Sequence, residues 1–486
     1  MAHPLLRTKS VDDLRDDAHR DQALRRTLTA TDLVLLGIGA IIGTGIFVLT
    51  GRAAAVNAGP AVSLSFVTAG IASAFAGLCY AEMASMIPVA GSAYTYAYAT
   101  MGELVAWMIG WDLILEYLVA AATVSVGWSG YVVAFIKHTT GIQLPMEWTT
   151  APIAWSEAEQ AFNTTGAIMN LPAVLIVLAV TVVLVVGIKE SARFNAIIVF
   201  VKVAVVLMFI AFAAPYVRTE NWTPFIPPNT GEFGRFGWSG IMQGATMVFF
   251  AYIGFDAVST AAQECKNPQR DLPIGILGSL AVCTVLYIIV SMILTGVVPY
   301  TELSVPHPIS VGIAVTGKMW LTTIVEVGAI AGLSSVMLVM LLGQPRIFYS
   351  MARDGLFPPI GAKVHPKYGT PHVTTIITGL LCAVCGGALP IDILGELTSV
   401  GTLFAFVLVS LGVMILRLKR PDIPRAFRVP GGAYIVPICG ALSSAALIYT
   451  ATTHTLIRLV AWMALGMVIY FAYSYKHSVL RKIDPA

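Results

Sequence analysis

The chain has 486 residues, of which 57% are hydrophobic and 11% charged, and its formal net charge is +3. Soluble proteins carry about 25% charged residues, so this composition excludes an ordinary soluble protein. The small positive charge gives no indication of nucleic-acid binding. Long apolar runs recur with short polar gaps, which predicts an all-α polytopic membrane protein in contact with lipid rather than an alternating membrane barrel.

Twelve membrane-spanning helices are predicted in chain order. They lie at residues 31–55, 60–86, 95–135, 170–188, 194–215, 238–262, 272–297, 320–350, 372–389, 395–417, 433–452 and 456–475. The third run is long enough to include an interfacial lead-in before Gly102. Residues 1–26 are polar, do not resemble a signal peptide, and predict a cytoplasmic segment that is either disordered or a short amphipathic helix.

The distribution of basic residues predicts the orientation. With both termini inside, 22 of the 29 Lys and Arg residues fall on inner segments and 6 on outer loops, which leaves only Lys202, inside a span. Basic residues favour the cytoplasmic side of a membrane. We therefore expect a multi-pass protein of the plasma membrane with both termini in the cytoplasm.

Two predicted spans carry glycine near their centres and indicate an internal repeat. The first contains "IGAIIGTGIF" (38–47) and the sixth contains "FFAYIGFDAVSTAAQE" (249–264). Units that start five spans apart enter the membrane from opposite faces, as an inverted repeat with two broken helices requires. Glycines that only allow close helix packing are the alternative. The predicted organisation is a cytoplasmic segment, two inverted five-helix repeats, helices 11 and 12, and a cytoplasmic tail, at residues 1–26, 27–215, 237–417, 433–475 and 476–486.

A break in the first span would create a site for a zwitterion. The amides after the break begin a half-helix, whose positive end binds a carboxylate. The freed carbonyl of Ile41, with those of the sixth span near Phe250 and Ile253, could accept hydrogen bonds from an ammonium group. The glycines of the stretch let a ligand approach the backbone. This pattern predicts an L-amino acid substrate and leaves its side chain undefined.

Lys202 is the one basic residue predicted inside the membrane. Desolvation penalises the charged form of a buried amine, so this lysine could exchange between a protonated and a neutral state. Such a group could couple transport to protons. The alternative is a permanent structural ion pair with an internal carboxylate.

Six acidic residues lie in or near the predicted spans: Glu82, Asp112, Glu116, Asp256, Glu264 and Glu326. Glu82 and Glu264 lie near inner span ends, where a helix-end role and a gate role are both open. Asp112 and Glu116 share one helix face. Glu116 could meet a cationic substrate side chain, pair with Lys202, or accept from a buried backbone donor.

The eighth span supplies polar and adaptable residues near its centre. Ser334 and Ser335 are its polar groups, and Met337 and Met340 follow within two turns. Methionine adapts to irregular volumes and could line a pocket, although plain core packing is the more frequent reason for it.

Three motifs carry a resemblance that extends over residues 25 to 475. "GIGAIIGTGIF", "FFAYIGFDAVSTAAQECKNPQRDLPIGI" and "PRIFYSMARDGLFP" closely resemble amino acid–polyamine–organocation (APC) transporters, in particular the bacterial type of the cationic amino acid transporter (CAT) branch. The resemblance implies a LeuT-like fold of five plus five inverted helices, with helices 1 and 6 broken and helices 11 and 12 appended. It also implies alternating access around a midplane site.

By motif position, the resemblance assigns roles to individual residues. Gly43, Thr44 and Gly45 would bind the substrate carboxylate. The carbonyls of Ile41, Phe250 and Ile253 would bind the amino group, Ala251 of the same turn would contact the substrate, and Phe250 would be an aromatic gate. Lys202 falls where proton-coupled members carry a lysine in place of sodium, with Ser335 as its neighbour.

The chain departs from the family at two positions that bear on substrate choice. Animal CAT members tend to carry a small polar residue where Glu116 stands, and some relatives carry small residues near Met340. A methionine would shrink the side-chain pocket. Arginine or lysine and a small neutral amino acid such as alanine therefore both remain candidate substrates.

The sequence favours a proton-coupled importer of cationic or small neutral L-amino acids over three alternatives. An obligate exchanger would not need a titratable Lys202. A membrane sensor would need an output domain, which neither terminus is long enough to hold. An enzyme is not indicated, because the eight histidines form no metal-spaced cluster and no acid–base group. No cofactor or metal is predicted, and the sequence does not specify an accessory subunit.

Overall fold

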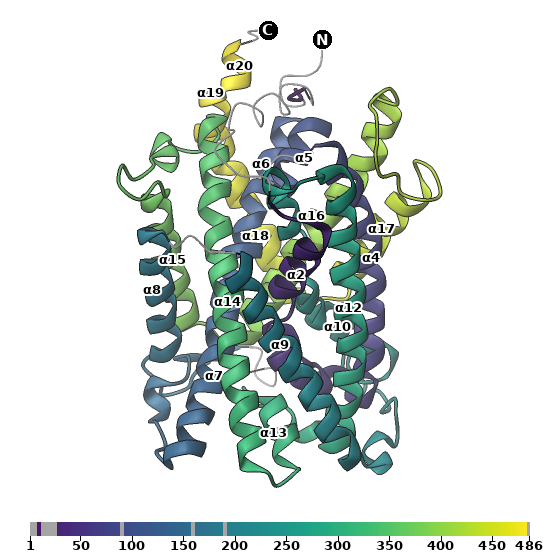
Figure 1. Cartoon of the computed structure of the whole chain (residues 1–486), viewed down its shortest axis with the longest axis vertical. Helices are drawn as coiled ribbons and strands as arrows, with labels where there is room; N and C mark the ends of the chain where they lie inside the picture. The colour runs from purple at the N-terminus through teal and green to yellow at the C-terminus, as the bar shows by residue number, and fades with distance from the viewer. Residues whose placement is uncertain (1–6, 11–26, 88–91, 157–160, 188–191, 484–486) are drawn as a thin grey trace.

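The chain forms an elongated bundle of helices (Figure 1). The computed structural model describes residues 7–10, 27–87, 92–156, 161–187 and 192–483. Most of the predicted segment 1–26, the inner-loop residue Lys189 and the last three residues of the predicted tail lie outside this part. In the described residues, eight helical stretches are long and apolar enough to cross a membrane, and four shorter apolar helices accompany them.

The elements keep the order of the predicted spans. The helices of the bundle are α2 (Ala30–Ile41), α4 (Val62–Met86), α6 (Glu103–Ile114), α7 (Ala120–Thr140), α8 (Leu171–Val186), α9 (Ala192–Ala213), α10 (Gly237–Val248), α12 (Pro268–Val297), α14 (Met319–Arg353), α15 (His372–Ala388), α16 (Ile391–Lys419), α17 (Ile435–Tyr449) and α18 (Thr453–Ile469). Shorter helices are α3 (Thr50–Ala53), α5 (Ser92–Thr100), α11 (Ala257–Thr260), α13 (Pro308–Ala314), α19 (Tyr475–His477) and α20 (Val479–Ile483). One antiparallel hairpin, β1 (Ile153–Ser156) and β2 (Ala161–Thr164), precedes α8.

The helical run Gly45–Met86 is divided at Gly59. Its 42 residues would form a rod of about 63 Å, twice the thickness of a bilayer's hydrocarbon core. Gly59 has φ 60°, and a Cβ there would lie 2.5 Å from Pro227 Cγ. Only glycine fits this backbone without strain. The turn falls between the predicted runs 31–55 and 60–86.

The helix that carries Glu116 has two irregular points. Gly102, with φ 100°, separates the lead-in helix α5 from α6. A π-helical turn at Leu115–Val119 then joins α6 to α7. Such turns inside helices are frequent at functional sites, and this one contains Glu116.

Small residues allow the central helices to approach closely. Helix α12 packs against both α2 and α4, and α14 packs against α7. A Cβ on Gly37 of α2 would lie 2.4 Å from Ser279 Oγ, and one on Gly77 of α4 would lie 2.5 Å from Leu280 Cδ1. Close packing between small residues is the usual contact between membrane helices.

Both ends of the described chain lie at one end of the bundle, and α13 lies at the other (Figure 1). At the terminus-bearing end, the side chain of Asp354 is 3.4 Å from Lys9 Nζ, and its carbonyl accepts from Val479 N–H at 3.0 Å. The buried carboxylate of Glu103 accepts from Arg481 Nε at 3.0 Å and from Tyr470 Oη at 2.9 Å. The terminal segments are thus fastened to the bundle by two carboxylates.

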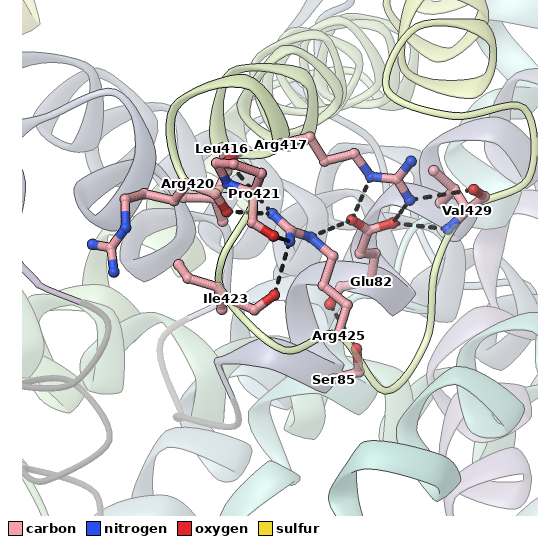
Figure 2. A network of polar contacts seen from close by, with 9 residues as sticks. All are labelled: Glu82, Ser85, Leu416, Arg417, Arg420, Pro421, Ile423, Arg425 and Val429. Atoms are coloured by element: carbon pink, nitrogen blue, oxygen red, sulfur yellow. Dashed lines mark hydrogen bonds and ion pairs between the residues drawn. The ribbon is translucent and has the colours of Figure 1, made fainter.

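A second polar network joins α4 to the loop between α16 and α17 at the same end (Figure 2). Glu82 is fully buried and forms an ion pair with Arg417 through both of its oxygens. Arg425 Nε lies 3.3 Å from Glu82 Oε1, and Val429 N–H donates to Oε2 at 2.8 Å. Glu82 thus forms a buried ion pair near the end of α4.

Candidate functional site

The first broken helix, residues 30–58, is interrupted at Ile42 and Gly43. Helix α2 starts with a capping box at Thr29 and ends at Ile41, after which Ile42 takes an extended conformation with ψ 103°. The helix resumes at Thr44, and Phe47 N–H donates to the Gly43 carbonyl at 3.1 Å. The first amides of a helix have no partner within it, so a row of donors faces the break.

The second broken helix, residues 237–260, is interrupted later in the chain. Helix α10 gives way to a 3₁₀ turn, Phe249–Tyr252, and helical structure resumes at α11. Between them Gly254 has φ 116°, and a Cβ there would lie 3.0 Å from the carbonyl carbon of Ala40. Glycine is required here both by the backbone angle and by the approach of α2.

The two breaks are in direct contact. A Cβ on Gly45 would lie 2.2 Å from the Cα of Ala251, so backbone meets backbone at this point. Thr44 lies on the same turn, and its Oγ1 is buried with no hydrogen-bond partner in the described chain. The carboxylate-binding and amine-binding turns predicted from sequence are therefore adjacent in the structure.

The carbonyls predicted to bind the amino group already accept hydrogen bonds. The Ile41 carbonyl accepts from Tyr287 Oη at 3.0 Å, and the Phe250 carbonyl accepts from Ile253 N–H at 3.2 Å. Each carbonyl oxygen has a second lone pair, so an ammonium group would share these acceptors rather than find them free. Tyr287 belongs to α12, and sequence reasoning missed it because its partner is 246 residues away.

Lys202 is fully buried next to the first break. Its Nζ donates to the Gly39 carbonyl in the last turn of α2 at 2.5 Å. Its aliphatic stem lies against Gly332 of α14, where a Cβ would be 3.2 Å from Lys202 Cγ. In the described residues no carboxylate lies within 4.0 Å of this ammonium group, which counts against a structural ion pair.

Lys202 and Ser335, predicted to be neighbours, each donate a hydrogen bond to a backbone carbonyl. Ser335 Oγ donates to the Gly332 carbonyl of its own helix at 3.1 Å, whereas Ser334 accepts from Trp128 Nε1 at 2.9 Å. Lys202 therefore meets the turn that contains Ser335 but bonds to α2. A serine hydroxyl in a helix is readily satisfied by the carbonyl three or four residues before it.

The wall of α14 beside the break is apolar. Met337 and Met340 are both buried, as a lining or core position requires. The side chain nearest Gly43 is Val336, whose Cγ2 would lie 3.1 Å from a Cβ at that glycine. The sequence reading missed Val336, although it lies four residues before Met340 and thus on the same helix face.

Buried acids lie on the segment of Glu116. Both carboxylate oxygens of Asp112 are buried without hydrogen-bond partners in the described chain. The buried carboxyl group of Glu116 lies beside that of Asp256, and neither Asp112 nor Glu116 forms an ion pair with a basic residue of the described chain. Asp256, after the second break, accepts from Tyr117 Oη at 3.0 Å. Glu116 is thus not the partner of Lys202, and both Glu116 and Tyr117 connect this segment to the second broken helix through Asp256.

Comparison with known proteins places the chain in a family. Residues 28–472 match the family model described as amino acid permease. The chain belongs to the amino acid permease family of the APC superfamily. It is 50% identical over 483 residues to the branched-chain amino acid permease BcaP of Bacillus subtilis (strain 168), covering 99% of this chain and 100% of that protein.

Further relatives extend this family placement. The methylthioribose transporter of the same organism is 45% identical over 98% of this chain and 99% of its own length. The vacuolar cationic amino acid transporter 4 of Arabidopsis thaliana is 38% identical over 86% of this chain and 68% of its own. These matches confirm the predicted resemblance to the CAT branch. They also confirm an integral membrane transporter rather than an enzyme.

Proposed function

We propose that this family member imports neutral L-amino acids together with protons across the plasma membrane. In this proposal the twelve apolar segments all span the bilayer, and residues 27–215 and 237–417 form the inverted repeats. The terminus-bearing end faces the cytoplasm. The substrate binds at mid-depth, with its carboxylate on the amides of Gly43 to Gly45 and its amino group on the carbonyls of Ile41, Phe250 and Ile253.

The observation that carries proton coupling is the Lys202–Gly39 hydrogen bond. A protonated lysine there places a positive charge at the carbonyl end of α2, which is the negative end of its dipole. Loss of the proton removes that charge beside the break to which the substrate binds. Lys202 thereby links the proton to the substrate, and an exchanger would have no use for this link.

Two observations support a neutral, apolar substrate over arginine or lysine. Val336, Met337 and Met340 place apolar side chains on the α14 wall beside Gly43. A relative with 50% identity is named a branched-chain amino acid permease. Glu116 supports the cationic alternative, because it is a buried acid that forms no ion pair with a basic residue of the described chain. We give preference to leucine-sized and smaller neutral substrates.

The test is uptake into proteoliposomes with an imposed pH gradient. Labelled leucine and alanine should accumulate when the outside is acidic, and a protonophore should abolish accumulation. Lys202→Ala should lose gradient-driven uptake, whereas Lys318→Ala, a partly exposed loop lysine, should keep it. Accumulation that requires internal amino acid and ignores the protonophore would overturn proton coupling in favour of exchange. Stronger competition by arginine than by leucine would overturn the substrate class.

A further inference from the structure

Helix α13 and the residues just before it lie at the end opposite the termini (Figure 1). Pro308 packs on α3, where a Cβ on Gly51 would lie 2.5 Å from Pro308 Cβ. Pro306 packs on α7, where a Cβ on Gly130 would lie 2.5 Å from Pro306 Cβ. The segment is thus wedged between α7 and the half-helix that follows the first break. We call residues 306–314 the α13 cover.

A buried carboxylate helps to fasten the cover to the bundle. Ser310 Oγ donates to Glu326 Oε1 of α14 at 2.6 Å, and Glu326 is fully buried. His138 Nδ1, at the end of α7, lies 2.6 Å from the same oxygen. His138 and Glu326 both belong to the bundle, so their contact persists when the cover moves, whereas the Ser310 bond is broken together with the packing of the cover on its neighbours.

His307 is the titratable residue of the cover itself. Its Nδ1 atom is buried and has no hydrogen-bond partner in the described chain. Its ring lies edge-on to Tyr131, with 6.4 Å between the ring centroids. The Tyr131 hydroxyl in turn donates to the Phe47 carbonyl at 2.7 Å. The histidine therefore docks on the side chain that holds the half-helix after the first break.

The surroundings of His307 disfavour a positive charge. From α7 it faces His138 and Lys137, and the buried acid of α14 that His138 and Ser310 contact is Glu326. Arg52 of α3 bonds to Ser304 and to Asp392. Burial, and then the neighbouring His138 and Lys137, lower the pKa of His307 to about 4. A solvated histidine has a pKa of about 6.5.

We infer that the α13 cover is released by acid, because the buried, unpartnered Nδ1 of His307 and the cations beside it make the site against Tyr131 unfavourable for a protonated ring. Under the orientation proposed above, the cover lies on the outer face. External acid would then open the route to the broken helices on the side from which protons enter. The role of external acid rests on the proposed function, because that proposal sets the orientation in the membrane. The acid-induced release of the cover does not depend on it.

Linkage fixes the sign and the size of the effect. A histidine whose pKa is lowered in the docked state stabilises docking at high pH, and this contribution is lost as the pH falls from about 6.5 toward 4. When the pH falls from 7.5 to 5.5, the ratio of undocked to docked cover rises about tenfold if the undocked histidine has its ordinary pKa. Opening of the cover should therefore rise about tenfold over this interval.

Amide hydrogen exchange of the full-length protein in lipid nanodiscs tests the inference without substrate or gradient. After correction for intrinsic exchange rates, peptides that cover 306–314 should open about tenfold more often at pH 5.5 than at pH 7.5. His307→Gln should show the same opening at both pH values. His454→Gln, which changes another histidine of the same end on α18, should keep the wild-type ratio.

A second variant protects the test against misfolding of the first. Ser310→Ala removes the bond to Glu326 but keeps His307, so opening should increase at both pH values with the tenfold ratio retained. A pH-independent wild type, or an unchanged ratio in His307→Gln, would overturn the inference. Because the exchange assay needs no transport, this failure is distinguishable from a failure of the proposed import activity.

Discussion

The contact between Gly45 and Ala251 offers a direct test of the two broken helices. We predict that Gly45→Ala destabilises the protein strongly and that Gly43→Ala, two residues earlier, does not. The added Cβ at position 45 would lie 2.2 Å from Ala251 Cα and 2.6 Å from its backbone nitrogen. At position 43 the nearest atom is Val336 Cγ2, at 3.1 Å, which is the end of a side chain.

The size of the effect follows from these distances. Carbon atoms in contact are separated by about 3.5–4.0 Å, so Gly45→Ala must push the two breaks apart by more than about 1 Å. Overpacking of a core usually lowers the free energy of unfolding by about 1–3 kcal/mol. The obstructing atoms at Gly45 belong to the backbone and cannot turn aside, so we expect a loss of about 3 kcal/mol for Gly45→Ala. At about 2 °C per kcal/mol for a large chain, the apparent melting temperature should fall by about 6 °C.

The assay is thermal unfolding of the purified protein in one detergent at one scan rate, because unfolding of membrane proteins is often irreversible. Gly43→Ala should melt within about 2 °C of wild type, since Val336 can turn aside. The double variant Gly45→Ala/Ala251→Gly should not recover, because the obstructing Cα and nitrogen remain. Equal melting of the two single variants, or rescue by Ala251→Gly, would refute the backbone contact.

Three further variants test other parts of the structure. Glu82→Gln should lower the melting temperature much more than Arg420→Gln, which breaks the exposed Arg420–Asp422 pair. The reason is that breaking a buried ion pair costs about 3–5 kcal/mol. Equal shifts in melting temperature would contradict the network of Figure 2. Tyr287→Phe should increase the affinity for the amino acid by up to about tenfold, as measured by calorimetry, because it frees the Ile41 carbonyl. A lower affinity would count against that carbonyl as a ligand. Gly59→Ala should reduce the yield of folded protein on size-exclusion chromatography. The control is Gly141→Ala, because Gly141 also has a positive φ but no atom lies within 4 Å of an added Cβ. This control should lower the yield less, because it introduces backbone strain without a steric clash.

The breaks in the helices were predictable because glycine disrupts an otherwise uniform apolar pattern. "IGAIIGTGIF" marked the interruption at Ile42 and Gly43, and Gly102 marked the start of α6. What the sequence did not reveal is which donors reach the broken ends. Tyr287 and Lys202 arrive from α12 and α9, and their partners in α2 are 246 and 163 residues away.

Side-chain roles on α14 were harder to predict for a related reason. The family resemblance placed Ser335 beside Lys202, and the structure shows that the Ser335 hydroxyl donates to a carbonyl of its own helix. Valine does not stand out, so Val336 was overlooked, although it is the residue nearest Gly43. Composition identifies unusual residues, whereas position on a helix face decides which of them reach the site.

The fastening of both chain ends to Glu103 and Asp354 has a consequence for biogenesis. Both acids are synthesised before Arg481 and Val479, the residues near the end of the described chain that form hydrogen bonds with them. Until those residues leave the ribosome, the carboxylate of Glu103 lacks its arginine, and a buried unpaired charge is costly. The end of the bundle that holds both termini therefore lacks one of its ion pairs until Arg481 has been synthesised.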